Sequence, residues 1–246
     1  MTRDATARAL NWIEEGLVPD RVVRLGIQRL LRARLDEVAA GDAESGAAID
    51  QRFFESLGRA PLALVPEKAN EQHYEVPAAF FEAVLGPHRK YSCCHWGPDT
   101  QDLEQAEAAA LAATCERAGL ADGQDVLELG CGWGSLSLWM AARYPRSRIT
   151  AVSNSHSQRE TIAALALSRG LSNLRVITAD FNDFDTEQRF DRVVSIEMFE
   201  HLRNWPQAFA RVAHWLRADG RFFMHVFAHN GAGYPFVARD ASDWMS

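Results

Sequence analysis

An acidic residue followed by three alternating glycines is the most chemically informative pattern in this sequence. The segment Val126-Leu-Glu-Leu-Gly-Cys-Gly-Trp-Gly-Ser135 ends an apolar run and opens a helical pattern, and it contains Glu128, Gly130, Gly132 and Gly134. Glycines let the chain turn tightly and bring backbone N–H groups close to a ligand. A dinucleotide-binding turn, G-x-G-x-x-G, would need glycine at position 135. A pyrophosphate favours the bare positive end of a helix, whereas a nearby carboxylate favours a cationic ligand.

S-adenosylmethionine (SAM) is such a ligand, because its methionine part carries an ammonium and a sulfonium. The glycine segment resembles motif I of class I SAM-dependent methyltransferases. The resemblance implies that Asp180 and Phe181, after the third apolar run, lie beside the adenine, where Asp180 can accept a hydrogen bond from the adenine amino group. The alternative is that Asp180 is only a turn residue, for which aspartate is a common choice. The second run ends at Ser153 and Asn154, with Gln158 one turn later, and these neutral side chains are expected to bind the ribose hydroxyls.

Two carboxylates and an imidazole share one turn after the fourth apolar run, at Glu197, Glu200 and His201. Strand carboxyl ends are where α/β sheets bind ligands, and such a cluster is costly near apolar surface without a purpose. Such carboxylate and imidazole groups can accept or donate a proton. The structural alternative is a solvated acid pair that caps the next helix, with His201 packed under it.

A second resemblance narrows the family. Residues 70–97, which run from Asn-Glu-Gln-His-Tyr to Lys-Tyr-Ser-Cys-Cys-His-Trp-Gly, resemble the region before motif I in the cyclopropane-fatty-acyl-phospholipid synthase superfamily. That superfamily includes coclaurine-type N-methyltransferases, and the resemblance covers about residues 17–246. It implies that Tyr91 and Ser92 contact SAM and that Cys93 lines the reaction site through its backbone. His73, Tyr74 and Glu75 are candidates to cover the substrate.

The resemblance implies two alternative chemistries. Cyclopropane synthases resemble this chain at Glu200 and at the pair His225 and Phe227, which help hold a bicarbonate base, but they commonly have a small residue at the position of Glu197. Coclaurine-type N-methyltransferases resemble the whole Glu-x-x-Glu-His arrangement, and the adjacent Cys93 and Cys94 are closer to them. This resemblance implies that the glutamates hold a cationic amine and that a glutamate or the histidine removes its proton, so that the nitrogen can attack a methyl group. We therefore expect methylation of an amine or other small nucleophile, with an unsaturated lipid as the alternative substrate.

The elements that must position these residues alternate along the second half of the chain. Short apolar runs at 126–129, 148–153, 174–179, 190–196 and 220–227 are separated by helical patterns at 135–144, 157–169 and 206–216. Such alternation predicts a mainly parallel α/β sheet with right-handed crossovers. The resemblance implies a Rossmann-like class I methyltransferase sheet with strand order 3-2-1-4-5. Before it, helices are predicted at 77–84 and about 103–118, the second with Thr100 as a candidate cap.

Bulk composition bounds the remaining possibilities. The 246 residues carry a net charge of −7, which argues against a nucleic-acid partner. No secretory signal and no apolar run of spanning length stands out, so reduced thiols in a cytoplasm are expected. None of the four cysteines shares a CxxC spacing with another, so no metal site is expected.

The N-terminal part is predicted to be a helical region, residues 1–68, before a SAM-binding domain at 69–246. A helix from about residue 20 interleaves arginines with apolar residues; it either lies on an anionic lipid surface or packs on the catalytic domain. Residues 39–50 are small and polar and predict a linker or loop. At the other end, class I methyltransferases normally continue through two more strands, so the chain is expected to be C-terminally truncated. A SAM-binding module without turnover is therefore a further alternative.

Overall fold

A computed structural model of the chain describes residues 3–38, 43–63 and 77–228. Leu57–Phe227 form one compact unit, and the described residues up to Ser56 belong to a second unit. The domain boundary predicted at residue 68 falls outside the described ranges, so it stays a prediction.

The N-terminal unit is helical, as expected. It contains α1 (Arg3–Glu14), α2 (Asp20–Val38) and most of α3 (Ala43–Arg59). The linker predicted at 39–50 is wrong for residues 43–50, which form the start of α3, because alanine-rich sequence favours a helix. The two predicted roles of α2 remain open. Among the described residues, no helix is both long and apolar enough to cross a bilayer.

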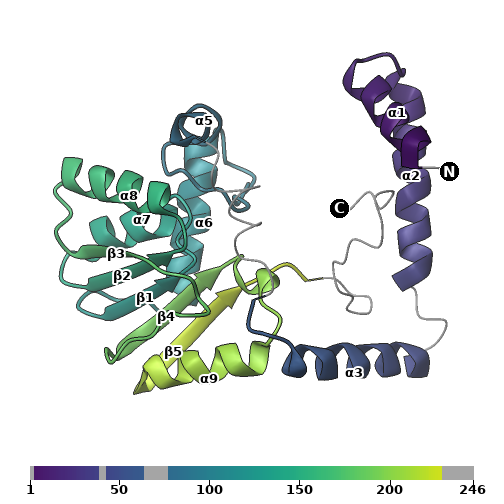
Figure 1. Cartoon of the computed structure of the whole chain (residues 1–246). Coiled ribbons are helices and arrows are strands. Elements are labelled where there is room, and N and C mark those ends of the chain that lie inside the picture. The colour runs from purple at the N-terminus through teal and green to yellow at the C-terminus, as the bar shows by residue number, and fades with distance from the viewer. Residues whose placement is uncertain (1–2, 39–42, 64–76, 229–246) are drawn as a thin grey trace. The chain divides into compact units, whose positions relative to one another are not determined.

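Five parallel strands form the sheet of the compact unit (Figure 1). They are β1 (Asp125–Leu129), β2 (Arg148–Ser153), β3 (Leu174–Thr178), β4 (Phe190–Ile196) and β5 (Leu216–His225). Their order is β3-β2-β1-β4-β5, with every neighbouring pair parallel, which confirms the expected topology. All five residues of β1 are buried, as expected for a central strand covered on both faces.

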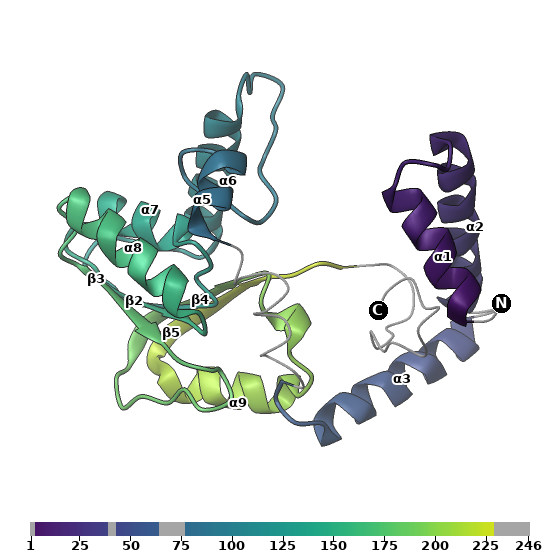
Figure 2. The same ribbon diagram turned by 45° about the horizontal axis from the view of Figure 1, so that its top comes forward.

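Helices cover both faces of this sheet (Figures 1 and 2). On one face α6 (Leu103–Arg117), α7 (Ser135–Arg143) and α8 (His156–Ser168) pack against the strands, and on the other lies α9 (Trp205–Trp215). Successive side chains of β1 point to opposite faces of the sheet, so they enter different hydrophobic cores. Val126 packs with α6 and α7, whereas Leu127 and Leu129 pack with α9. A short helix, α5 (Ala78–Val84), precedes α6.

Two local predictions need correction. Strand β5 begins at Leu216 rather than Gly220, because Leu216 pairs with Phe190 across an irregular register that sequence patterns do not reveal. The cap of α6 is Asp102, whose side chain accepts a hydrogen bond from the Gln105 N–H, and not Thr100. Thr100 instead accepts a hydrogen bond from the backbone N–H of Gly97.

Charged pairs close the amino-terminal edge of the sheet. Asp125, the first residue of β1, receives hydrogen bonds from Arg148 on β2 and Arg217 on β5, and Arg217 also pairs with Asp191 on β4. Burial disfavours the Asp125 charge, but the arginines outweigh it and lower the pKa of Asp125. These carboxylates are therefore neutralised by structural partners, which leaves the opposite edge for chemistry.

Candidate cofactor and active site

The predicted site residues gather at the carboxyl-terminal edge of the sheet. The glycine turn follows β1, Ser153 ends β2, Asp180 follows β3, Glu197 follows β4 and His225 ends β5. Because all five strands are parallel, these ends lie along one edge. This is the edge at which open α/β sheets bind ligands.

The glycine turn has the backbone that its sequence predicts. Gly130, Gly132 and Gly134 have φ angles of 74°, 52° and 81°, in the left-handed region that glycine tolerates best. A Cβ on Gly130 would lie 2.9 Å from the side chain of Met198, so no larger residue fits there. A Cβ on Gly132 would meet nothing within 4 Å. The turn is therefore packed at its base and open at Gly132.

Glu128 lies beneath this turn rather than on its surface. Its side chain is buried and accepts a 2.5 Å hydrogen bond from the Ser137 hydroxyl on α7. Burial raises the pKa of Glu128 to about 7, although Ser137 and the nearby Lys90 ammonium act in the opposite direction. A cation above the turn would favour the ionised carboxylate.

The ends of β2 and β3 carry the polar residues predicted to face the nucleoside. Ser153 donates to the Gln158 side-chain oxygen at 2.6 Å, and Gln158 is 2% exposed. The Gln158 Nε2 is buried without a hydrogen-bond partner among the described residues, and Asn154 is half-buried. An unpaired buried donor at this edge suits a ligand rich in hydroxyl and ring-nitrogen acceptors.

Asp180 and Phe181 both have structural contacts. One carboxylate oxygen of Asp180 accepts a 2.7 Å hydrogen bond from the Asn182 N–H, which is the turn role that sequence allowed as an alternative. The Phe181 ring packs edge-on against Trp215, with the Arg211 guanidinium 5.3 Å from its centre. Contact of either side chain with adenine stays a prediction.

The segment before α6 brings Tyr91, Ser92 and Cys93 to the site. Its backbone is held by Glu107, a fully buried residue of α6 whose two oxygens accept 2.9 Å hydrogen bonds from the N–H groups of His88 and Lys90. Lys90 is a buried residue, and its ammonium donates to the Ser92 hydroxyl. The Tyr91 ring packs edge-on against Phe81 of α5, which itself lies on Trp133 of the glycine turn.

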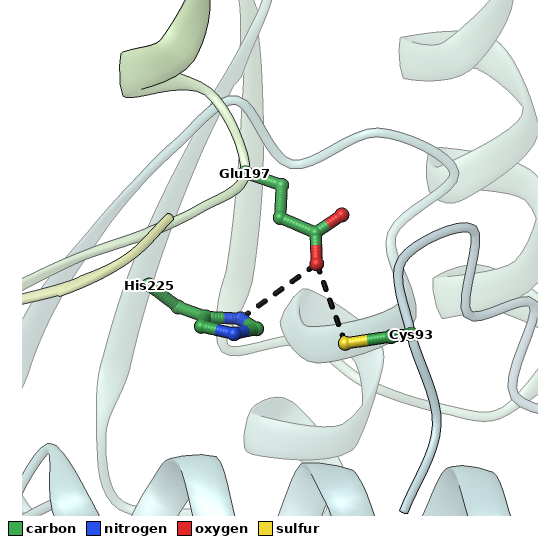
Figure 3. Close-up of side chains that lie close together, drawn as sticks. All are labelled: Cys93, Glu197 and His225. Atoms are coloured by element: carbon green, nitrogen blue, oxygen red, sulfur yellow. Dashed lines mark hydrogen bonds and ion pairs between the residues drawn. The ribbon is translucent and has the colours of Figure 1, made fainter. Parts of the chain in front are cut away.

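Cys93, Glu197 and His225 converge from three separate parts of the chain (Figure 3). The Cys93 thiol lies 3.5 Å from Oε1 of Glu197, and Nδ1 of His225 lies 3.8 Å from the same oxygen. Partial burial and the Glu197 charge raise the pKa of Cys93, which favours the thiol as a hydrogen-bond donor to Glu197. The resemblance predicted a backbone role for Cys93, whereas here its side chain makes the contact.

Glu197 occupies a strained backbone position. Its φ is 54°, and its N–H donates a 2.8 Å hydrogen bond to the carbonyl of His225, which joins the ends of β4 and β5. A residue other than glycine seldom adopts this conformation, and such strain concentrates at functional sites. Glycine, which has no Cβ, would adopt this conformation without strain.

Glu200 and His201 occupy the short helix η1 (Phe199–His201), with different surroundings. Oε1 of Glu200 accepts a 2.7 Å hydrogen bond from the Phe227 N–H, while its Oε2 is buried and has no partner among the described residues. The His201 ring is exposed and makes no side-chain hydrogen bond within the described part of the chain. The structure therefore brings Glu197, not His201, next to the other predicted catalytic groups.

Comparison with known proteins agrees with this geometry. The family model described as mycolic acid cyclopropane synthetase matches residues 65–244. The chain belongs to this family. It is 36% identical over 237 residues to the (S)-coclaurine N-methyltransferase of Thalictrum flavum subsp. glaucum, covering 96% of this chain and 66% of that protein. The cyclopropane-fatty-acyl-phospholipid synthase of Escherichia coli (strain K12) is 34% identical over 158 residues, 63% of this chain and 40% of that one.

A solved structure extends the likeness to three dimensions. Coclaurine N-methyltransferase bound to N-methylheliamine and SAH superposes with a TM-score of 0.92 at 36% identity, covering 98% of this chain and 69% of that one. The fold is that of a class I methyltransferase. The chain spans 66% of the Thalictrum flavum relative and 58% of an Eschscholzia californica (S)-tetrahydroprotoberberine N-methyltransferase, which is 34% identical.

Sequence reasoning missed two supporting residues of this family member. Glu107 lies in an alanine-rich helical segment with two other glutamates, and Lys90 is one of many charged residues. Only their burial and their bonds to the 88–92 segment distinguish them. His73, Tyr74 and Glu75, the predicted substrate cover, lie outside the described residues.

Proposed function

We propose that this protein is a SAM-dependent methyltransferase that methylates an amine. The observation that carries the proposal is the Glu197 carboxylate, held at the carboxyl edge of the sheet beside a glycine turn that is open at Gly132. The relatives named as N-methyltransferases of coclaurine and tetrahydroprotoberberine support a cyclic amine as the substrate class. The four cysteines are free thiols, in keeping with a reducing cytoplasm.

The residues present fit the cofactor. Gly132 leaves room for a ligand, Glu128 is a carboxyl group beneath it that a bound cation would ionise, and Gln158 has a buried donor to satisfy. In this proposal the glycine turn, Tyr91 and Ser92 hold the methionine part. The nucleoside is held by Ser153, Asn154, Gln158, Asp180 and Phe181.

When bound, SAM supplies a methyl group that its sulfonium has already activated. The protein therefore needs to align a nucleophile and manage one proton. The Glu197 carboxylate attracts a protonated amine, and Glu197 or His225 accepts the proton that must leave before nitrogen can attack. Glu200, through its unpaired oxygen, adds negative charge to the same edge.

Cyclopropanation of an unsaturated lipid is the second candidate. It is favoured by the hydrogen bond from the Phe227 N–H to Glu200 and by the position of His225, the residues that the synthase resemblance singles out. A carboxylate at Glu197, in a backbone conformation suited to glycine, favours the amine instead.

The test uses labelled SAM with a panel of cyclic amines and unsaturated phospholipid vesicles. Transfer of label to an amine nitrogen is the expected result. A cyclopropane product would replace this proposal with the second candidate, SAM binding without transfer would favour a module without turnover, and absence of SAM binding would refute all three.

A matched glycine pair tests the cofactor turn. Gly132 and Gly170 have φ angles of 52° and 68°, and a Cβ on either would meet nothing within 4 Å. Gly132→Ala and Gly170→Ala should therefore lose similar stability, about 1 kcal/mol, from the left-handed backbone alone. Only Gly132→Ala should weaken SAM binding, measured by calorimetry. Equal SAM affinities for the two variants would remove the turn from the cofactor site.

A further inference from the structure

The Cys93, Glu197 and His225 side chains place one sulfur, one carboxylate oxygen and one imidazole nitrogen at a common point (Figure 3). The three ligand atoms all lie within 4.8 Å of one another. A thiolate, a carboxylate and an imidazole together favour zinc and similar borderline cations over calcium and magnesium.

The spacing is close to that of a tetrahedral site. With bonds of about 2.3 Å to sulfur and about 2.0 Å to nitrogen and oxygen, tetrahedral ligands lie roughly 3.5 Å apart for sulfur and oxygen, and roughly 3.3 Å for oxygen and nitrogen. The observed separations are 3.5 Å from the Cys93 thiol to Glu197 and 3.8 Å from Glu197 to His225. The Cys93 sulfur and the His225 nitrogen lie within 4.8 Å of each other, and side-chain rotation that brings them to about 3.5 Å would complete the geometry.

The backbone already holds two of these ligands together. The Glu197 N–H donates to the His225 carbonyl at 2.8 Å, and Glu107 fixes the segment that ends at Cys93. The site is also accessible, because the His225 side chain is 42% exposed and Cys93 is exposed. Three protein ligands with an open fourth position form the arrangement of an exchangeable zinc ion.

We propose that Cys93, Glu197 and His225 form an inhibitory binding site for Zn²⁺ or a similar borderline divalent cation. The inhibitory part rests on the proposed function, because the bound ion would occupy the Glu197 oxygen that otherwise attracts the amine. Binding releases the Cys93 proton, so affinity rises with pH. The CxxC criterion applied to the sequence could not find the site, since its ligands are spread over residues 93–225.

Cobalt(II) is the spectroscopic probe for the test, added to the full chain under reducing, chelator-free conditions. Cobalt(II) in a tetrahedral site with a thiolate gives intense visible bands and a sulfur-to-cobalt charge-transfer band in the near ultraviolet. Zn²⁺ should displace the cobalt and abolish all of these bands. Cys93→Ala should abolish the charge-transfer band. His225→Ala should weaken Zn²⁺ affinity at least about 100-fold, beyond the usual effect of a residue outside the ligand set.

The matched control is Cys94→Ala, because the Cys94 thiol faces the Ser92 carbonyl instead of Glu197. It should keep the cobalt spectrum, and near-ultraviolet circular dichroism should show every variant folded. A charge-transfer band that survives Cys93→Ala, or disappears in Cys94→Ala, would overturn the site.

Activity separates this proposal from the previous one. Zn²⁺ should inhibit methyl transfer by wild type and by Cys94→Ala, and a chelator should restore it. Methyl transfer without a cobalt spectrum would refute the metal site alone. A cobalt spectrum without transfer to any substrate would refute the proposed function and leave the metal site standing.

Discussion

The left-handed backbone conformation of Glu197 should destabilise the folded protein, and glycine at this position should avoid that cost. Its φ of 54° is a left-handed conformation that costs a residue with a Cβ about 1–2 kcal/mol. Glycine avoids this cost but has more freedom to lose on folding, about 0.4–1 kcal/mol. The midpoints of these ranges leave Glu197→Gly more stable than Glu197→Ala by about 0.8 kcal/mol, with roughly 1.6 kcal/mol as the upper limit.

Urea unfolding of the two variants measures this difference, because both lack the carboxylate and differ only in the Cβ. The matched control is Glu160, an exposed residue inside α8, where the order should reverse because glycine is about 1 kcal/mol worse than alanine in a helix. If Glu197→Ala were at least as stable as Glu197→Gly, the strained backbone would not be imposed by the fold.

The same two variants also test function. Both should lose amine methylation by roughly 10²–10⁴-fold, the usual contribution of a positioned general acid or base. A more stable Glu197→Gly that no longer methylates amines would show that the glutamate is kept for chemistry against a stability cost. Full activity in either variant would exclude Glu197 from the mechanism.

Two further variants test the buried carboxylates that support the site. Glu107→Gln should destabilise the protein by about 1–3 kcal/mol in urea unfolding, because one of its two backbone N–H partners would face an amide N–H group instead of an oxygen. The control is Glu104→Gln, since Glu104 is exposed on the same helix. Equal stabilities of the two variants would show that the hydrogen bonds to Glu107 do not stabilise the fold. Glu128 has its pKa raised by burial from 4.5 to about 7, so the folded state keeps a proton that the unfolded state releases. Wild type should therefore lose about 3 kcal/mol relative to Glu128→Gln as the pH rises from 4.5 to about 7, and parallel stability curves would refute the shifted pKa.

Local sequence patterns predicted the secondary-structure elements of the sheet and the position of the cofactor turn. The alternation of apolar runs and helical patterns predicted the elements of the parallel sheet, and family resemblance supplied their order. Glu128 and the alternating glycines located the turn after β1, where each glycine has a positive φ. These features depend on residues a few positions apart, so side-chain periodicity and backbone preference reveal them directly.

Tertiary structure decided which side chains meet. Cys93, Glu197 and His225 come together only because β4 and β5 are neighbours and Glu107 anchors the segment before α6. The exposure of His201 could not be predicted, because a single turn orients neighbouring side chains differently. Convergence of this kind depends on strand order and on buried polar contacts between distant segments, which no local pattern records.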